Sequence, residues 1–219
     1  MEWTDIKTTV PAVWAETAEA IATGISGGGI YIEDYRDLEA QVEAIAAARP
    51  AGLILREKNL PEADYQALAS DVLRICKRYE LPCILHTFVG AAQALGVKQI
   101  HLPLPVLRAQ SKEALSGFAQ IGVSCHSVAE AFEAQALGAT YLTAGHIFLT
   151  TCKPGLPGRG LDFLREVTQA VSLPVYAIGG ITADRVPELQ AAGAAGACLR
   201  SSLMLAPDPA AELHPYQEV

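Results

Sequence analysis

The feature that most constrains this chain is an alternation of short, β-prone apolar runs with longer amphipathic runs, which begins near residue 30. The short runs predict buried strands, and the longer ones repeat apolar residues at helical spacing. The expected strands span residues 30–33, 52–56, 83–86, 99–102, 122–126, 140–144, 175–178 and 196–199, and the expected helices span residues 38–48, 62–79, 90–95, 112–119, 127–137, 162–171 and 184–192.

Strands that alternate with helices predict a parallel sheet, and eight such units predict an α/β fold of the (β/α)₈ TIM-barrel type. The alternative is an open, Rossmann-like sheet. Against it, no expected strand is followed by a G-x-G-x-x-G run, and the glycines follow the seventh and eighth strands instead. Those are the turns where barrels bind phosphate.

The first 29 residues do not fit the alternation. Residues 2–10 predict a strand, residues 11–23 predict a helix with Pro11 in its first turn, and Gly27–Gly29 predicts a break. We therefore expect two parts, an atypical strand-helix extension over residues 1–29 that caps one barrel mouth and a barrel domain over residues 30–219. Residues 30–33 are expected to serve as the first strand of the barrel.

Composition excludes several classes of protein. Of the 219 residues, 51% are hydrophobic and only 6% aromatic, and 16 basic against 24 acidic side chains leave a net charge of −8, which opposes broad binding to nucleic acid or to an anionic membrane. No apolar stretch reaches the roughly 18 residues of a spanning helix and no signal peptide is visible, so we expect a cytoplasmic protein. Five cysteines without C-x-x-C pairing indicate neither a disulfide framework nor a zinc ribbon. The oligomeric state stays open, a homo-oligomer included.

A long loop rich in glycine and proline follows the sixth expected strand, over residues 145–160. It carries His146, Thr150, Lys153 and Arg159. Because the catalytic face of a barrel is formed by the loops after the strands, these side chains are candidates for chemistry. The alternative is a solvated loop with incidental polar residues.

Two further clusters follow other strands. Gly179-Gly180 follows the seventh strand and Arg200-Ser201-Ser202 the eighth, where a short helix is expected to begin near Ser201. Together they predict a phosphate-binding cup, although the glycine pair alone is equally consistent with a tight turn. After the second strand, period two points Arg56 and Lys58 the same way, toward a phosphate or carboxylate, or into a salt-bridged rim.

Four histidines lie in or near the ends of strands three to six, at His86, His101, His126 and His146. Neutral imidazoles on adjacent strands suit zinc, but catalytic zinc sites usually add carboxylates, and no Asp or Glu ends these strands. We therefore predict no metal site. His101 and His126 are expected to be hydrogen-bonded structural histidines.

The motifs Leu55-Arg56-Glu57-Lys58, Gly145-His146-Ile147-Phe148, Thr150, Lys153-Pro154, Ala177-Ile178-Gly179-Gly180-Ile181 and the turn at Ser201 resemble thiamine phosphate synthases and their sister group, the TenI-type thiazole tautomerases. The likeness covers about residues 47–206. It implies a TIM barrel of thiamine biosynthesis.

The departures from that family point to the tautomerase side. Synthases carry Asn-Asp-Arg after strand three and an Asp beyond strand four, which supply ligands for Mg²⁺, whereas this chain has His86-Thr87-Phe88 and Leu102-Pro103-Leu104-Pro105. Gly145-His146 stands where synthases have Gly-Pro, and residues 152–160 also look like the tautomerase version. The resemblance thus implies no cofactor, with Mg²⁺ needed only if the chain is a synthase.

The reaction so implied aromatises a carboxylated thiazole phosphate by moving a proton from ring carbon two to the exocyclic alkylidene carbon. His146 is the expected acid–base group, because an imidazole takes and gives protons near neutral pH. Arg56 and Lys58 are the other expected catalytic residues, which neutralise the substrate carboxylate or stabilise developing negative charge. The expected substrate-binding residues are Thr150, Lys153, Gly179, Gly180, Ser201 and Ser202.

Arg200 stands where the resembled families usually have an apolar residue; it either adds to the phosphate site or turns outward. The small-molecule partner is a thiazole phosphate. The alternatives are a thiamine phosphate synthase that couples hydroxymethylpyrimidine pyrophosphate to thiazole phosphate, and a non-catalytic phosphate-ligand-binding or regulatory protein.

Residues 1–46 carry a second resemblance. Met1–Lys7 and Gly29–Leu38 are similar to the start of a methyltransferase that modifies a ribosomal protein of the large subunit. No methyltransferase catalytic domain follows, so we do not infer methylation. The resemblance implies that the chain joins two gene pieces.

Overall fold

The structure, a computed structural model, describes residues 12–16, 35–57, 59–150, 153 and 155–217. Eight parallel strands form a closed barrel in chain order. They are β1 (Ala12–Glu16), β2 (Gly52–Leu55), β3 (Cys83–His86), β4 (Gln99–Pro103), β5 (Gln120–Cys125), β6 (Tyr141–Gly145), β7 (Val175–Ile178) and β8 (Gly196–Leu199). This is an α/β fold of the TIM-barrel type.

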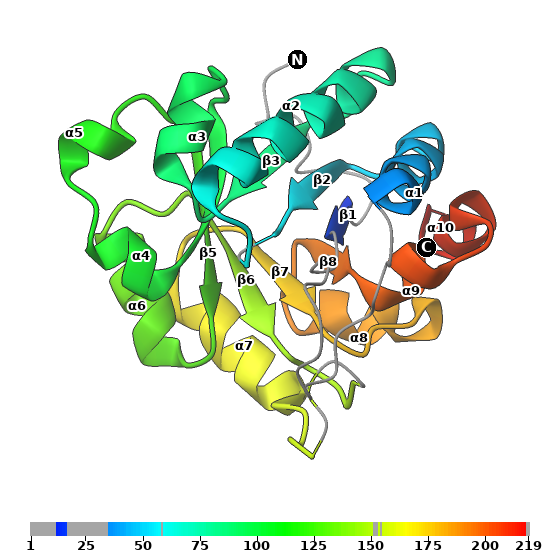
Figure 1. Ribbon diagram of the computed structural model, residues 1–219. Helices are drawn as coiled ribbons and strands as arrows, with labels where there is room; N and C mark the ends of the chain where they lie inside the picture. Colours follow the sequence, from blue (N-terminus) through cyan, green and yellow to red (C-terminus); the bar gives the residue numbers. More distant parts are fainter. Residues whose placement is uncertain (1–11, 17–34, 58, 151–152, 154, 218–219) are drawn as a thin grey trace.

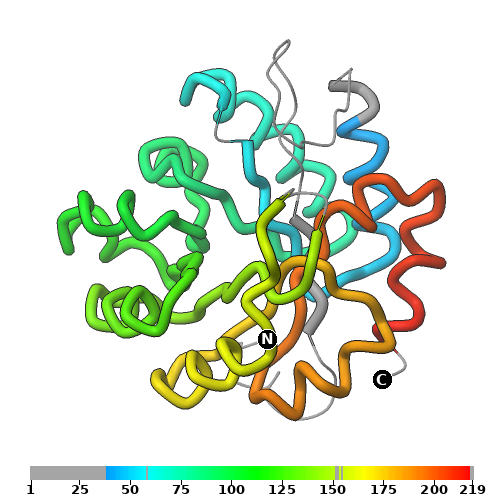
Figure 2. The backbone as a smooth tube through the Cα atoms, turned by 90° about the horizontal axis from the view of Figure 1, so that it is seen from below, coloured from blue at the N-terminus to red at the C-terminus, as the bar shows by residue number. Residues whose placement is uncertain are grey.

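Helices surround the strands, as the two views in Figure 1 and Figure 2 show. They are α1 (Tyr35–Ala47), α2 (Glu62–Arg78), α3 (Val89–Ala94), α4 (Leu104–Arg108), α5 (Lys112–Leu115), α6 (Val128–Ala136), α7 (Gly160–Ala170), the 3₁₀ helix η2 (Ala183–Arg185), α8 (Val186–Ala191), α9 (Ser201–Leu205) and α10 (Pro209–Gln217). Within the described residues, none of these helices combines the length and the apolar character needed to cross a membrane.

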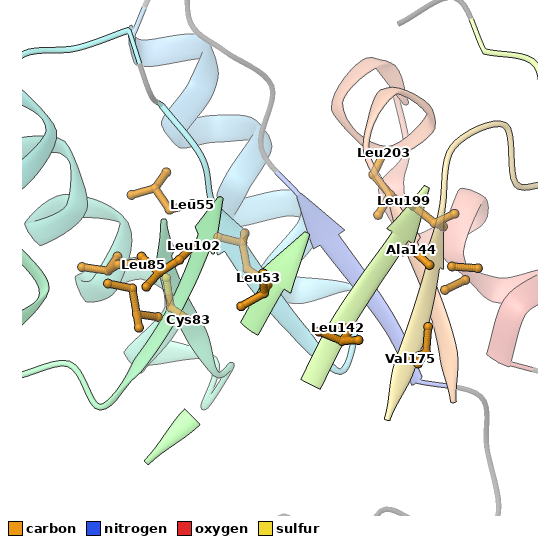
Figure 3. Packing of buried hydrophobic residues seen from close by; sticks show 14 of the residues in the cluster. Leu53, Leu55, Cys83, Leu85, Leu102, Leu142, Ala144, Val175, Leu199 and Leu203 are labelled. Atoms are coloured by element: carbon orange, nitrogen blue, oxygen red, sulfur yellow. The ribbon is translucent and has the colours of Figure 1, made fainter. Parts of the chain in front are cut away.

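The strands divide their side chains between two cores. Leu53 and Leu55 belong to the large cluster that packs strands against helices, while Ile54 between them belongs to a smaller cluster inside the barrel. Figure 3 shows part of the large cluster, with Leu142 on β6 and Leu203 on α9. Because side chains alternate across a strand, fully buried strands of this kind are continuously apolar. This explains why the short runs in the sequence lack a polar face.

Most of the expected elements are confirmed. Strands 83–86, 175–178 and 196–199 have the bounds predicted, and the other described strands from β2 onward differ by at most two residues. All seven expected helices are present, although α5 ends at Leu115, well before residue 119. Helices α4 and α10 were not expected.

The N-terminal prediction is wrong over residues 12–16. The sequence favours a helix over residues 11–23, but Ala12–Glu16 forms β1, which pairs with Gly52–Ile54 of β2 and with Gly196–Leu199 of β8. Pairing on both edges outweighs local helix propensity, because an open barrel would expose two rows of backbone hydrogen-bonding groups. The described part of the expected extension therefore belongs to the barrel. The strands expected at residues 2–10 and 30–33 lie outside the described residues.

Candidate active site

A cavity of about 230 Å³ lies at the carboxyl ends of the strands. Its walls come from β2, from β4 to β8 and from the segments that follow them. The described residues that line it are Ile54, Arg56, His101, Ser124, Cys125, His126, Thr143, Gly145, His146, Thr150, Lys153, Ile178, Gly179, Gly180, Ile181, Cys198, Leu199, Arg200, Ser201 and Ser202. This is the face on which TIM barrels carry their active sites.

The cavity brings together nearly all of the expected site residues. From segments far apart in the sequence, it gathers Arg56, His146, Thr150, Lys153, Gly179, Gly180, Ser201 and Ser202. Lys58 lies outside the described residues. The expected helix near Ser201 is α9, which begins at that residue.

His146 is held by backbone contacts on both sides of the β6–α7 loop. Ile147 N donates to Ile178 O at 2.9 Å, and Arg159 N donates to His146 O at 2.9 Å. The ring nitrogen Nε2 lies 3.4 Å from Leu156 O. Since a carbonyl oxygen only accepts, this contact favours the tautomer with hydrogen on Nε2 and a lone pair on Nδ1.

Arg159 does not face the cavity as the sequence suggested. Its Nε donates to Gly145 O at 3.0 Å, and its guanidinium lies 5.5 Å from the ring centroid of Phe163. The side chain therefore ties the end of the loop back to the end of β6. Arg159 positions the backbone beside His146 rather than lining the ligand site.

The glycine pair after β7 allows this loop to approach closely. Gly179 and Gly180 have φ of 98° and 66°, which disfavour residues with a side chain. A Cβ on Gly179 would collide with Cα and Cβ of His146, and one on Gly180 would collide with Leu149 O and with Phe148. The turn and the His146 loop therefore pack backbone against backbone.

A buried polar network forms the floor of the cavity around His101. Its Nδ1 lies 3.0 Å from Tyr141 Oη and its Nε2 lies 2.9 Å from Ser124 Oγ. Burial, with the nearby positive charge of Arg56, lowers the pKa of His101 to about 3. His101 is thus a neutral, hydrogen-bonded histidine, as expected, although it also lines the cavity.

Cys125 lines the cavity as a buried thiol. Burial is the main factor that raises the pKa of its thiol to about 12. A thiol with this pKa stays protonated at neutral pH, whereas covalent catalysis by cysteine requires the thiolate.

His126 was expected to be structural, yet it lines the cavity at the end of β5, and 54% of its side chain is exposed. Its Nδ1 lies 3.3 Å from Glu130 Oε2, and its backbone N donates to the same oxygen at 2.6 Å. A carboxylate at Nδ1 favours hydrogen on that nitrogen and leaves Nε2 as the acceptor. Ser127 Oγ accepts from Glu130 N, so a Ser-x-x-Glu capping pattern in the sequence could have pointed to Glu130.

Arg56 follows a strand end that is fastened by a buried tyrosine. Tyr65 Oη donates to Leu55 O at 2.8 Å and accepts from His86 N at 2.8 Å. Burial raises the pKa of this hydroxyl, so it remains protonated. Tyr65 thereby joins the carboxyl ends of β2 and β3 next to Arg56.

The Lys, Arg, Asp and Glu residues of the described cavity lining carry one sign of charge. This lining includes Arg56, Lys153 and Arg200 and no Asp or Glu. Among the described residues, no three His, Cys, Asp or Glu side chains gather where they could hold a metal ion. Mg²⁺ prefers carboxylate and other oxygen ligands. The described donor set therefore does not fit this ion.

A closed parallel barrel with a small cavity at the carboxyl ends of its strands, lined by Arg56, Lys153 and Arg200, defines a TIM-barrel protein. Residues 28–203 match the family model described as thiamine monophosphate synthase. The chain belongs to this family, the thiamine monophosphate synthase and TenI family, whose members are enzymes of thiamine biosynthesis.

Relatives carry the synthase name. A thiamine-phosphate synthase from Salinispora arenicola is 38% identical over 180 residues, which cover 80% of this chain and 86% of the relative. Another from Caldivirga maquilingensis is 34% identical over 189 residues, covering 83% and 91%. These names support the synthase alternative better than the tautomerase interpretation.

Solved structures agree on the fold. A thiamine phosphate pyrophosphorylase from Pyrococcus furiosus superposes with a TM-score of 0.74 at 24% identity and covers 94% of each chain. A 3-hexulose-6-phosphate synthase superposes with a TM-score of 0.68 at 17% identity, covering 93% of this chain and 98% of the other. At these identities the likeness concerns the fold alone.

Proposed function

We propose that this chain is a thiazole tautomerase-like isomerase that aromatises a carboxylated thiazole phosphate by proton transfer. The observation that carries the proposal is the composition of the cavity lining: two partly exposed imidazoles and three cations, without a carboxylate among the described residues. Imidazoles transfer protons near neutral pH, and cations bind an anionic substrate.

His146 takes the proton from ring carbon two through Nδ1, the nitrogen that its contact with Leu156 O leaves with a lone pair. The electron pair of the broken C–H bond moves through the ring toward the exocyclic alkylidene carbon, which then accepts a proton. The reaction is an isomerisation and consumes no other reagent.

His126 supplies a second imidazole in the same cavity. Because Glu130 lies at Nδ1, the ring is oriented with Nε2 available. Protonated at Nε2 from solvent, this imidazole gives that proton to the exocyclic carbon. His146 releases to solvent the proton that it took from ring carbon two, so both rings regain their starting states and no net proton is consumed. A pair of proton-transfer groups suits a reaction that removes a proton at one carbon and adds one at another.

The two anionic ends of the substrate have separate partners. Arg56, which follows β2, faces the carboxylate. The phosphate lies against the backbone of Gly179 and Gly180 and the hydroxyls of the two serines that begin α9, Ser201 and Ser202. Thr150 and Lys153 line the remaining wall.

A second candidate is thiamine phosphate synthase, which the names of the relatives favour. That reaction displaces pyrophosphate, for which the family is expected to use Mg²⁺. The described residues offer no carboxylate in the cavity to hold this ion. We therefore derive no step through a metal.

The deciding experiment follows aromatisation of the carboxylated thiazole phosphate by wild type, His146→Gln and His126→Gln. We expect His146→Gln to lower turnover by about 10²–10⁴-fold and His126→Gln by at least about tenfold, because each removes a proton-transfer group. His214→Gln, an exposed histidine on α10, is the matched control and should retain wild-type turnover.

Three results would each contradict the proposed isomerase function or the role of His146 in it. Equal turnover in wild type and His146→Gln would exclude His146 as the acid–base group. Coupling of hydroxymethylpyrimidine pyrophosphate to thiazole phosphate with added Mg²⁺, in the absence of isomerisation, would establish the synthase. Binding of the thiazole phosphate without either reaction would indicate a non-catalytic ligand-binding protein.

A further inference from the structure

Among the described residues that line the cavity, Arg200 is a cation that the family motifs do not assign. It follows β8 directly and precedes α9, so it stands between the strand and the two serines. Its Nε is buried and has no hydrogen-bond partner among the described residues. A guanidinium is always charged and carries five N–H donors, so a buried unpartnered N–H requires an explanation.

The described cavity lining around Arg200 holds no anionic partner for it. Gly179 and Gly180 follow β7, and Ser201 and Ser202 follow Arg200 after the neighbouring strand β8; all of these residues line the cavity. No described Asp or Glu lines the cavity. An anionic ligand would supply the partner that the described lining does not offer to Arg200.

We propose that Arg200 binds the phosphate monoester of the substrate directly and determines selectivity for the phosphorylated ligand over its dephosphorylated form. The inference rests on the proposed function only in taking the ligand to be a phosphate ester. A guanidinium donates two parallel hydrogen bonds to phosphate oxygens, which adds both affinity and geometric selectivity. Arg56 and Lys153 reach the cavity from β2 and from the β6–α7 loop, which leaves the β7–β8 side to Arg200.

A structural role for Arg200 makes the opposite prediction for stability. If Arg200 supported the fold, its replacement would lower the melting temperature of the ligand-free protein. If Arg200 instead serves to bind a ligand, the ligand-free protein contains a buried N–H donor without a hydrogen bond, which lowers its stability. Replacing Arg200 removes this penalty, so the ligand-free protein should not lose stability. Stability without ligand and affinity for phosphate then change in opposite directions.

The test uses the full chain and inorganic phosphate as the probe, with calorimetric titration and thermal melting. Arg200→Gln should bind phosphate about 10- to 100-fold more weakly, the loss expected for a charge-assisted hydrogen bond. Its ligand-free melting temperature should equal that of wild type or exceed it by about 2–4 °C. Arg200→Lys should bind with intermediate affinity, because it keeps the charge and loses the planar fork.

Arg165→Gln is the matched control. Arg165 lies exposed on α7, pairs with Asp162 at 2.6 Å and does not line the cavity. The variant makes the same chemical change and should bind phosphate within about twofold of wild type, since surface ion pairs are weak.

Three results would overturn the inference. The wild type does not bind phosphate, or Arg200→Gln binds phosphate as tightly as the wild type does. The third is that both Arg200 variants melt at a lower temperature without ligand while their phosphate affinity is unchanged. Phosphate binding that depends on Arg200, in a protein that does not isomerise the thiazole, would uphold this inference and reject the proposed function. Isomerisation of the thiazole by a protein whose phosphate binding does not depend on Arg200 would uphold the proposed function and reject this inference.

Discussion

At the scale of single residues, His101 makes the stability of the protein depend on pH. Its pKa is about 3 in the folded barrel and about 6.5 in an unfolded chain, so between these values only the unfolded state binds the proton. Its contribution to stability is complete above pH 6.5 and declines as the pH falls toward 3, by up to about 1.4 kcal/mol per unit.

Replacing His101 with glutamine should remove this part of the pH dependence. Between pH 6.5 and 4.5 the free energy of unfolding of wild type should fall by about 2–3 kcal/mol more than that of His101→Gln. Urea titrations at several pH values measure the difference. Parallel slopes for wild type and His101→Gln would contradict a neutral buried His101.

At this scale the sequence predicts which residues reach the cavity better than it predicts what they do there. Arg56 and His146 follow strands, and strand ends define the catalytic face. The orientation of Arg159 toward Gly145 O depends on the path of the β6–α7 loop, which no local pattern reveals. The contact between His126 and Glu130, by contrast, is formed where α6 begins, and the local Ser-x-x-Glu capping pattern at Ser127 indicates it.

At the scale of elements, the Gly179–Gly180 turn packs against the loop that carries His146. Gly179→Ala should lower both stability and turnover, because it adds a methyl group that collides with His146 at a positive φ. The conformational penalty is about 1–2 kcal/mol, and the collision should shift His146 and reduce turnover by at least about tenfold. Urea unfolding and the isomerisation assay measure the two effects.

Gly138→Ala separates these two causes. Gly138 follows α6 with φ of 97°, nearly that of Gly179 at 98°, but nothing lies within 4 Å of the position of its Cβ. The variant should therefore lose stability through backbone strain alone and retain its turnover. Equal losses of turnover in both variants would show that the contact with His146 does not matter.

The elements themselves were largely predictable because strands buried on both faces are short apolar runs. Two helices were missed for identifiable reasons. Pro105 lowers the local helix propensity of Leu104–Arg108, but it lies in the first turn, where proline is tolerated. Pro215 lowers the helix propensity of Pro209–Gln217, but it lies in the last turn of that helix.

At the scale of the whole molecule, the sequence predicted an eight-stranded barrel but assigned the wrong segment to its first strand. Residues 12–16 are alanine-rich and lie in a stretch of high helix propensity. What makes them a strand is not local. Residues 12–16 form the strand that hydrogen-bonds to both β2 and β8. Because β2 and β8 lie far away in the sequence, the residues next to 12–16 do not reveal that these two strand edges need a partner.

Strand β1 closes the barrel by pairing with both β2 and β8. Removing residues 1–16 should open the barrel between β2 and β8 and lower the free energy of unfolding by several kcal/mol, a large share of the about 5–15 kcal/mol typical of a domain. The two exposed strand edges should also cause association of the shortened chains.

Removing residues 1–11 is the matched control, since it leaves β1 in place and should keep most of the stability. Urea unfolding and size-exclusion chromatography measure both effects. Equal stability of the two shortened chains would mean that β2 and β8 do not depend on residues 12–16 and that β2 to β8 hold the fold together without β1.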